Sequence, residues 1–221
     1  MMTNLFSSFD PMSATFSLQL NWISMSMFLI IFFPLFWISF SKSSILYTEI
    51  TNYITKEFIP LFKSYKNIIF FNVIFVFILI NNVFGLMPYT FTSTAHISMT
   101  LAMALTIWLS FMLYGWINNT KHMFAHLVPL GTPVVLMPFM VFIESISNII
   151  RPITLSVRLA ANLTAGHLLL ILLGESMVHS SALIIILVTL AQFLLMTLEA
   201  AVAVIQSYVF ATLSTLYASE V

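Results

Sequence analysis

Arg158 carries a permanent charge inside a long apolar stretch, and this is the strongest chemical signal in the sequence. From Pro133 to Tyr217 the chain is almost unbroken apolar residues, with only two arginines and three glutamates. On membrane-insertion scales an arginine at the centre of a bilayer costs about 2.5–3.5 kcal/mol. It cannot escape that cost by losing its proton, because its pKa stays above about 12. A chain tolerates such a residue where a partner charge or water meets it, so we interpret Arg158 first as a functional residue.

Further polar residues share one side of this stretch when it is drawn as a helix of 100° per residue. Glu144, Arg151 and Asn162 then fall within about 40° of Arg158 and form a polar stripe. His167 falls at about 180°, on the opposite face. Two structural interpretations stay open here: Glu144 and Arg151 as a buried ion pair, and His167 as a histidine of the core.

A second polar stripe follows from the spacing of Gln192, Glu199 and Gln206, which are seven residues apart. The carboxylates of the two stripes and the imidazole of His167 can be tuned to bind and release protons near neutral pH. Arg158 cannot relay a proton and repels one. An always-charged residue between titratable ones would therefore separate two proton paths.

The composition determines the class of protein. The 221 residues are 61% hydrophobic and 6% charged, with a mean hydropathy of +1.07, whereas soluble domains are about 25% charged. The formal net charge is zero, so nothing indicates nucleic-acid binding. There is no cysteine, which excludes disulfides and thiolate metal sites. We expect an all-α polytopic membrane protein with no metal site and no cofactor, formed by a single membrane domain over residues 1–221.

Segment lengths predict about five membrane crossings and one helix in the membrane interface, since about 20 apolar residues cross a bilayer. Residues 43–66 carry several charges, and their apolar positions recur at helical spacing, as in an interfacial amphipathic helix. A polar loop is expected at Asn118–His126. The predicted crossings are Leu18–Phe40, Asn67–Leu86, Ile97–Ile117, Pro133–Leu173 and Ser180–Tyr217.

The last two stretches, which together span residues 133–217, are about twice as long as a crossing requires. Each would extend roughly 55–60 Å as one helix, against a hydrocarbon core of about 30 Å. Either each stretch is broken into two short crossings, or the two form a hairpin tilted by about 60°, beyond the usual range. We favour the tilted hairpin, because neither stretch contains a convincing polar turn.

All five lysines fall in the segments Ser41–Lys66 and Asn118–His126, which five crossings place on one side of the membrane. The positive-inside rule makes that side the cytoplasm or matrix. The histidines His96, His122 and His126 lie near predicted loops, and we expect them to be solvated rather than to bind a metal. The adjacent residues Asn81 and Asn82 could pack against neighbouring helices or line a polar path, and the sequence does not decide between these roles.

One segment closely resembles a known family. RPITLSVRLAANLTAGH (residues 151–167), preceded by IESISNIIRP and followed by LEAAVAVIQSYVFATLSTLYASE (residues 198–220), resembles subunit a, or subunit 6, of the mitochondrial type of rotary ATP synthase. The resemblance spans nearly the whole chain, and the N-terminal third matches mainly in layout. It implies a steeply tilted final hairpin against a ring of subunit c, in the mitochondrial inner membrane.

The resemblance also implies a role for each site residue. Arg158 corresponds to the essential arginine that faces the carboxylates of the ring, and Asn162 and Gln206 correspond to polar residues that support it. The pair His167 and Glu199 belongs to the outer half-channel. The implied residues of proton translocation are thus Arg158, His167, Glu199, Asn162, Gln206 and, for the inner half-channel, Glu144.

The implied activity is coupling of proton flow to ATP synthesis, with no covalent catalysis by this chain itself. The implied partners are the subunit c ring, the peripheral stalk, other membrane-sector subunits and membrane lipid, with no nucleic acid. Two alternatives remain: a subunit of another proton-coupled membrane transporter, and a structural assembly subunit. A transporter usually has repeated halves, and the sequence shows no internal repeat.

Overall fold

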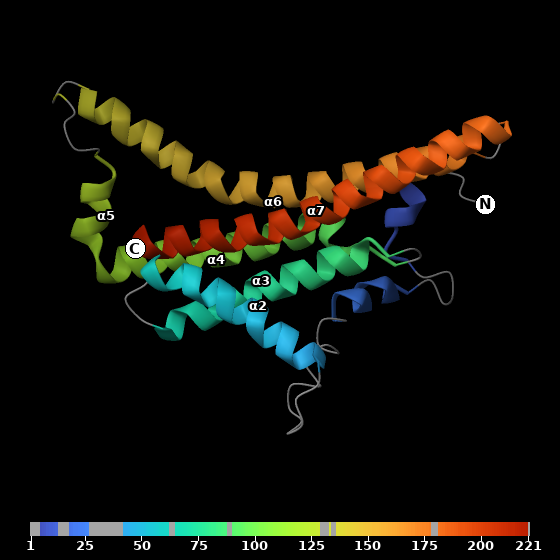
Figure 1. Ribbon diagram of the computed structural model, residues 1–221. Coiled ribbons are helices and arrows are strands. Elements are labelled where there is room, and N and C mark those ends of the chain that lie inside the picture. Colours follow the sequence, from blue (N-terminus) through green and yellow to red (C-terminus); the bar gives the residue numbers. More distant parts are fainter. Residues whose placement is uncertain are drawn as a thin grey trace.

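The computed structural model describes residues 5–12, 18–26, 42–61, 65–87, 90–128, 133, 136–177 and 181–220, and every regular element within these ranges is a helix. The predicted all-α membrane fold is confirmed. Figure 1 shows long helices that run across the molecule, with α6 along its upper edge and α2 below. Within these ranges, four helices are long and apolar enough to cross a membrane: α3 (Tyr65–Gly85), α4 (Ile97–Asn118), α6 (Met137–Met177) and α7 (Ala182–Glu220).

The predicted first crossing, Leu18–Phe40, can be followed only over its beginning, because residues 27–41 lie outside the described ranges. Its described part includes a short 3-10 helix, η2 (Leu20–Ser26). Another short helix, η1 (Leu5–Phe9), packs against α6. A third, η5 (Ser93–Ala95), precedes α4 and packs against η2, α3 and α6. These short helices gather at one end of the long ones.

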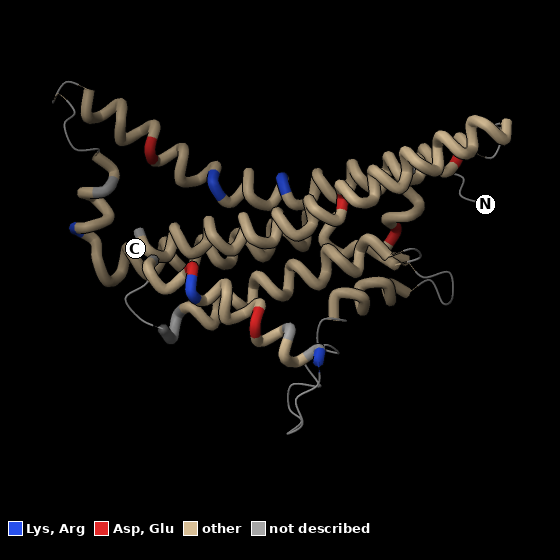
Figure 2. The backbone as a smooth tube through the Cα atoms, in the orientation of Figure 1, with Lys and Arg blue, Asp and Glu red and all other residues tan. Residues whose placement is uncertain are grey.

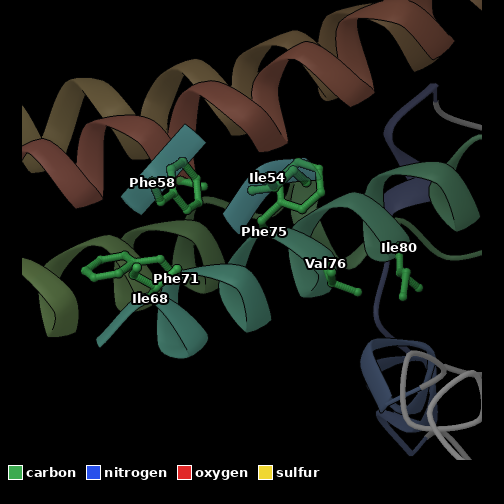
Figure 3. Close-up of a cluster of buried hydrophobic side chains, with 8 residues drawn as sticks. Ile54, Phe58, Ile68, Phe71, Phe75, Val76 and Ile80 are labelled. Atoms are coloured by element: carbon green, nitrogen blue, oxygen red, sulfur yellow. The ribbon is translucent and has the colours of Figure 1, made fainter. Parts of the chain in front are cut away.

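The predicted interfacial helix is α2 (Lys42–Phe58), continued by a 3-10 turn, η4 (Ile59–Leu61). Its apolar side chains Ile54 and Phe58 are buried in a cluster with Phe71 and Phe75 of α3 (Figure 3). On the other side of the same helix Tyr53 stays 69% exposed. The amphipathic pattern therefore fixes α2 on α3 through a narrow apolar face.

The predicted polar loop at Asn118–His126 is wrong. Most of this segment forms a short helix, α5 (Thr120–His126). It contains no glycine or proline to break a helix, and Phe124 packs edge-on against Trp116 with 4.9 Å between the ring centroids. The polar residues of the segment indicated only that it is exposed to solvent. An exposed helix is as compatible with such residues as a loop is.

The two long C-terminal stretches each form one continuous helix, so the alternative of two short crossings per stretch is excluded. The helix α6 runs through Pro152, which is buried inside it. Proline has no N–H for the carbonyl of Asn148, and its ring crowds that carbonyl. This gives a cause for the curvature of α6 in Figure 1.

The helices α6 and α7 form the predicted hairpin and pack along each other. Both helices carry buried small side chains, which let neighbouring membrane helices approach closely. Towards the end where α5 lies, the two helices diverge (Figure 1). The buried small residues are Ser156 and Ala160 on α6, and Ala203, Ser207, Ala211 and Ser214 on α7.

Candidate ion path

The side chain of Glu199 lies buried against α6 at Gly166. Only 4% of this glutamate is exposed. A Cβ atom placed on Gly166 would come within 2.7 Å of the Glu199 Cδ, a distance that real side chains do not adopt. The missing side chain of Gly166 therefore creates the space that the carboxyl group fills. His167, the next residue, is brought to the same level of the hairpin, as the sequence predicts.

Glu199 and His167 both hold buried polar atoms without a hydrogen-bond partner among the described residues: both carboxyl oxygens and the Nε2 atom. The imidazole of His167 lies against the backbone of Gly85 at the end of α3. Its ring also meets the ring of Phe9 edge-on, with 6.3 Å between centroids. An unsatisfied buried polar group costs about 1–3 kcal/mol, so these atoms are placed to meet a mobile partner such as water or a proton.

Arg158 projects from the opposite side of α6. Its side chain is exposed, while its neighbours Leu159 and Ala160 are buried. It makes no hydrogen bond or ion pair with any residue in the described part of the chain. Arg158 faces outward and His167 faces the packed interior of the molecule, in agreement with the prediction that they lie on opposite faces of α6.

The surface around Arg158 is apolar and contains small residues. Thr154, Ala161 and Ala165 are exposed on the same side of the helix, beside the larger Val157. Small side chains let another helix approach the backbone of α6 closely. An uncompensated guanidinium in such a surface requires a negative partner when the surface is covered.

The predicted supporting residues Asn162 and Gln206 are half-buried, on α6 and α7. The structure gives neither of them a hydrogen bond with Arg158 within the described ranges. Asn162 follows Arg158 by one helical turn on the same helix. The structure therefore brings Glu199 to the level of His167. Within the described ranges it shows no hydrogen bond from Arg158 to either predicted supporting residue.

At the other end of α6, Glu144 forms an ion pair with Arg151, with 3.5 Å between Oε1 and Nη2. Both side chains are about one-third exposed, at 32%. The guanidinium of Arg151 also lies over the ring of Tyr217 on α7, 5.5 Å from its centroid, in the range of cation–π attraction. The structural interpretation of this pair is supported, although the pair is only partly buried.

A cavity of 280 Å³ opens beside this pair, where α6 diverges from α7. Aromatic side chains such as Trp108 and Trp116 form much of its wall. Its polar lining comes from Ser145, Asn148, Arg151 and Tyr217. Of the ion pair, Arg151 lines this cavity directly.

Figure 2 shows how sparse the charged residues are along the long helices. No group of three or more histidines, cysteines or acidic residues that could hold a metal occurs within the described ranges. His122 is exposed. The predicted solvation of His96 holds only in part: its ring is half-buried between Trp22 and Phe91, with centroids 5.2 and 5.1 Å away, and its Nε2 atom is buried.

Sequence reasoning left the role of the pair Asn81 and Asn82 open and gave no indication that polar atoms of Thr94 and His96 are buried. Asn82 is fully buried and donates from Nδ2 to the carbonyl of Ala203, at 3.3 Å. Thr94 and His96 also carry buried polar atoms without a partner in the described chain. Their position next to a predicted loop gave no signal of burial.

The fold and these residues define a polytopic membrane protein whose spans carry ionisable groups. Residues 20–219 match the family described as ATP synthase A chain. The chain is 56% identical to ATP synthase subunit a of Drosophila mauritiana over 225 residues, covering all of both chains. Similarity of the same full extent occurs with ATP synthase subunit a of Anopheles gambiae (54%) and of Locusta migratoria (52%). The chain belongs to the ATP synthase A chain family.

Proposed function

We propose that this chain is the stator subunit that conducts protons through the membrane sector of a mitochondrial ATP synthase, in the inner membrane. The observation that carries the proposal is the arrangement on α6 and α7. A buried, unpartnered Glu199 lies at the level of His167, while the permanently charged Arg158 occupies the opposite side of the same helix. Titratable groups and a fixed positive charge are thereby kept apart.

In the outer half-channel, a proton from outside reaches His167 and Glu199 and passes to a carboxyl group of the rotating subunit c ring. Both side chains are capable of this, because a carboxylate and an imidazole each bind a proton reversibly. Their unpartnered atoms give the proton an acceptor, and Gly166 leaves room for it.

Arg158 meets the ring carboxylate in its charged form. The exposed small residues Thr154, Ala161 and Ala165 allow the ring helices to approach closely beside it. The ring carboxylate supplies the counter-charge that Arg158 lacks among the described residues of this chain. Because arginine stays protonated, it attracts the charged ring site and blocks direct proton passage between the two paths.

The inner half-channel leads from the ring past Asn162 and Gln206 to the cavity beside Arg151 and Tyr217, with Glu144 at its margin. A ring site that loses its proton near Arg158 releases it here. Separation of the two paths is essential, because moving one proton across the membrane releases about 2.3 kcal/mol per 100 mV of membrane potential. A continuous path would dissipate that energy.

The partners that follow are the subunit c ring, the peripheral stalk, other membrane-sector subunits and membrane lipid. The chain forms no covalent bond itself, and ATP is made in the soluble head of the complex. As a stator subunit it holds the two half-channels fixed while the ring turns.

The test is Arg158→Ala in the intact complex, reconstituted into liposomes. We expect an assembled complex that makes no ATP from a proton gradient. Val157→Ala, which changes an exposed neighbour without removing charge, should couple normally. Continued coupled synthesis with Arg158→Ala would overturn the barrier role. Arg158→Lys should not restore full coupling, because an ammonium can deprotonate when desolvated and lacks the planar fork.

A further inference from the structure

Buried polar atoms without partners continue beyond Glu199 and His167, toward the end of the molecule that holds η1, η2 and η5. Within the described residues these atoms are Asn82 Oδ1, Thr94 Oγ1 and His96 Nε2. Native proteins satisfy nearly all buried polar atoms with protein or water. Several such atoms in one region of an apolar fold therefore indicate water between them.

A series of contacts joins these residues to the Glu199 site. His167 lies against the backbone of Gly85, and a Cβ on Gly85 would lie 3.1 Å from Cγ2 of Thr92. Thr92 leads directly into η5, which contains Thr94. The short helix η5 packs on both α3 and α6. From the other side, Asn82 reaches the carbonyl of Ala203, one turn of α7 from Glu199.

His96 lies at the outer margin of this region, at the junction of η5 and α4. Its ring is only half-buried, stacked between Trp22 of η2 and Phe91, while its Nε2 points to a buried position. Ser24 Oγ donates to the carbonyl of Phe91 at 3.3 Å and ties η2 to the same place. A side chain that reaches both the surface and the interior is suited to the mouth of a path.

We propose that Thr94 and His96 extend the outer half-channel to the surface by binding water, with His96 at the mouth. This inference rests on the proposed function and adds two residues to it. His96 occupies the N-cap position of α4 and makes no side-chain capping hydrogen bond there, so its ring nitrogen is left for water. Its part is to hold that water, and a side-chain amide can replace it.

The competing explanation is structural: the His96 ring holds η2 and Phe91 in place by stacking. Two substitutions separate the explanations. His96→Phe keeps a ring for stacking and removes the nitrogen. His96→Gln removes the ring and keeps a polar group that can bind water. Thr94→Val and Thr94→Ser form a second pair of the same kind, in which only the valine lacks the hydroxyl.

The experiment measures passive proton flow and proton-driven ATP synthesis by the intact complex in liposomes, scaled to the amount of assembled complex. We expect His96→Phe and Thr94→Val to lower proton uptake from the outer side about fivefold or more, the effect of losing one buried hydrogen bond. His96→Gln and Thr94→Ser should stay close to the parent. His122→Phe, at an exposed site on α5, controls for loss of a histidine in general.

Normal flow with His96→Phe, or full loss with His96→Gln, would overturn the inference in favour of the stacking role. If His96→Phe does not assemble, the threonine pair decides in the same way. Glu199→Gln is measured in parallel. Loss of flow with Glu199→Gln but not with His96→Phe and Thr94→Val would leave the proposed function intact and reject only this extension. Normal flow with Glu199→Gln would reject both.

Discussion

The absence of one side chain makes room for Glu199, the acid of the proposed outer path. Gly166 faces the Glu199 carboxyl group so closely that a methyl group does not fit between them. We expect Gly166→Ala to displace Glu199 and to reduce proton-driven ATP synthesis strongly, while the complex still assembles. Gly174→Ala on the same helix is the matched control, because its Cβ would meet nothing within 4 Å.

The control variant Gly174→Ala is itself expected to stabilise α6 slightly. Alanine favours a helix over glycine by about 0.5–1 kcal/mol, so Gly174→Ala should keep full synthesis and assemble at least as well as the parent. Equal loss in both variants would mean that α6 tolerates no change of this kind. The contact between Gly166 and Glu199 would then have no special part in the activity.

Glu199 and His167 are predicted to act as one unit at the residue scale. Glu199 is buried and His167 is half-buried, and both carry buried polar atoms without a partner in the described chain, at the same level of the hairpin. We expect Glu199→Gln and His167→Gln each to slow proton uptake. The double variant should lose less than the sum of the single losses, because residues of one network are not additive. The measurement is a double-mutant cycle on passive proton flow, and additive losses would show that the two act separately.

The sequence is informative about single residues where charge is costly. The positions of Arg158 and Glu199 stand out because each lies in a long apolar run. The burial of Thr94 and of the Nε2 atom of His96 could not be predicted, since the two residues lie in a short segment whose polarity is typical of a loop. It comes with the packing of η5 on α3 and α6. That packing depends on tertiary structure, which local sequence does not encode.

At the scale of the elements, the amphipathic helix α2 is held on α3 by few side chains. Phe58 is 1% exposed and lies in the cluster of Figure 3, whereas Ile50 on the same helix is 52% exposed. We expect Phe58→Ala to destabilise the docking of α2 by about 3–5 kcal/mol, the usual cost of removing a buried phenylalanine.

Limited proteolysis of the intact complex measures this docking, through cleavage within residues 42–61. Cleavage should be much faster in Phe58→Ala than in the parent, and Ile50→Ala should resemble the parent. Equal rates in all three proteins would show that contacts other than this cluster hold α2. Another contact of α2 is the hydrogen bond that the Tyr208 hydroxyl of α7 donates to Glu57, at 2.8 Å.

The elements were predicted best where length and periodicity agree. The bounds of α3 and α4 follow from uninterrupted apolar runs, and the structure places them within a few residues of the prediction. The helix α5 was missed because a short polar segment without breakers fits a helix and a loop equally. Pro152 did not break α6, because a membrane helix packed against neighbours tolerates a proline.

At the scale of the whole molecule, the length of the C-terminal hairpin must be reconciled with the thickness of a bilayer. The helix α6 has 41 residues and α7 has 39. At about 1.5 Å per residue these are roughly twice the hydrocarbon core of about 30 Å. Both helices are continuous, so a steep tilt is the remaining solution, and it needs a large protein surface to lie against.

That surface is predicted to be the subunit c ring, on the side of α6 that carries Arg158. The parent chain has no cysteine, so a single introduced cysteine gives an unambiguous cross-link. Ala161→Cys changes an exposed small residue near Arg158, and Ser110→Cys changes an exposed residue on α4. With cysteines placed along the ring helices, we expect Ala161→Cys to cross-link to the ring in the intact complex and Ser110→Cys to remain unlinked.

The same cross-links report the tilt. If α6 lies steeply inclined, cysteines at Thr154, Ala161 and Ala165 should link to ring positions that change little in depth from one to the next. An upright helix would shift the linked ring position by its full rise of about 1.5 Å per residue. Linking from Ser110 but not from Ala161, or a full upright shift along α6, would contradict both the tilted hairpin and the ring as the partner of Arg158.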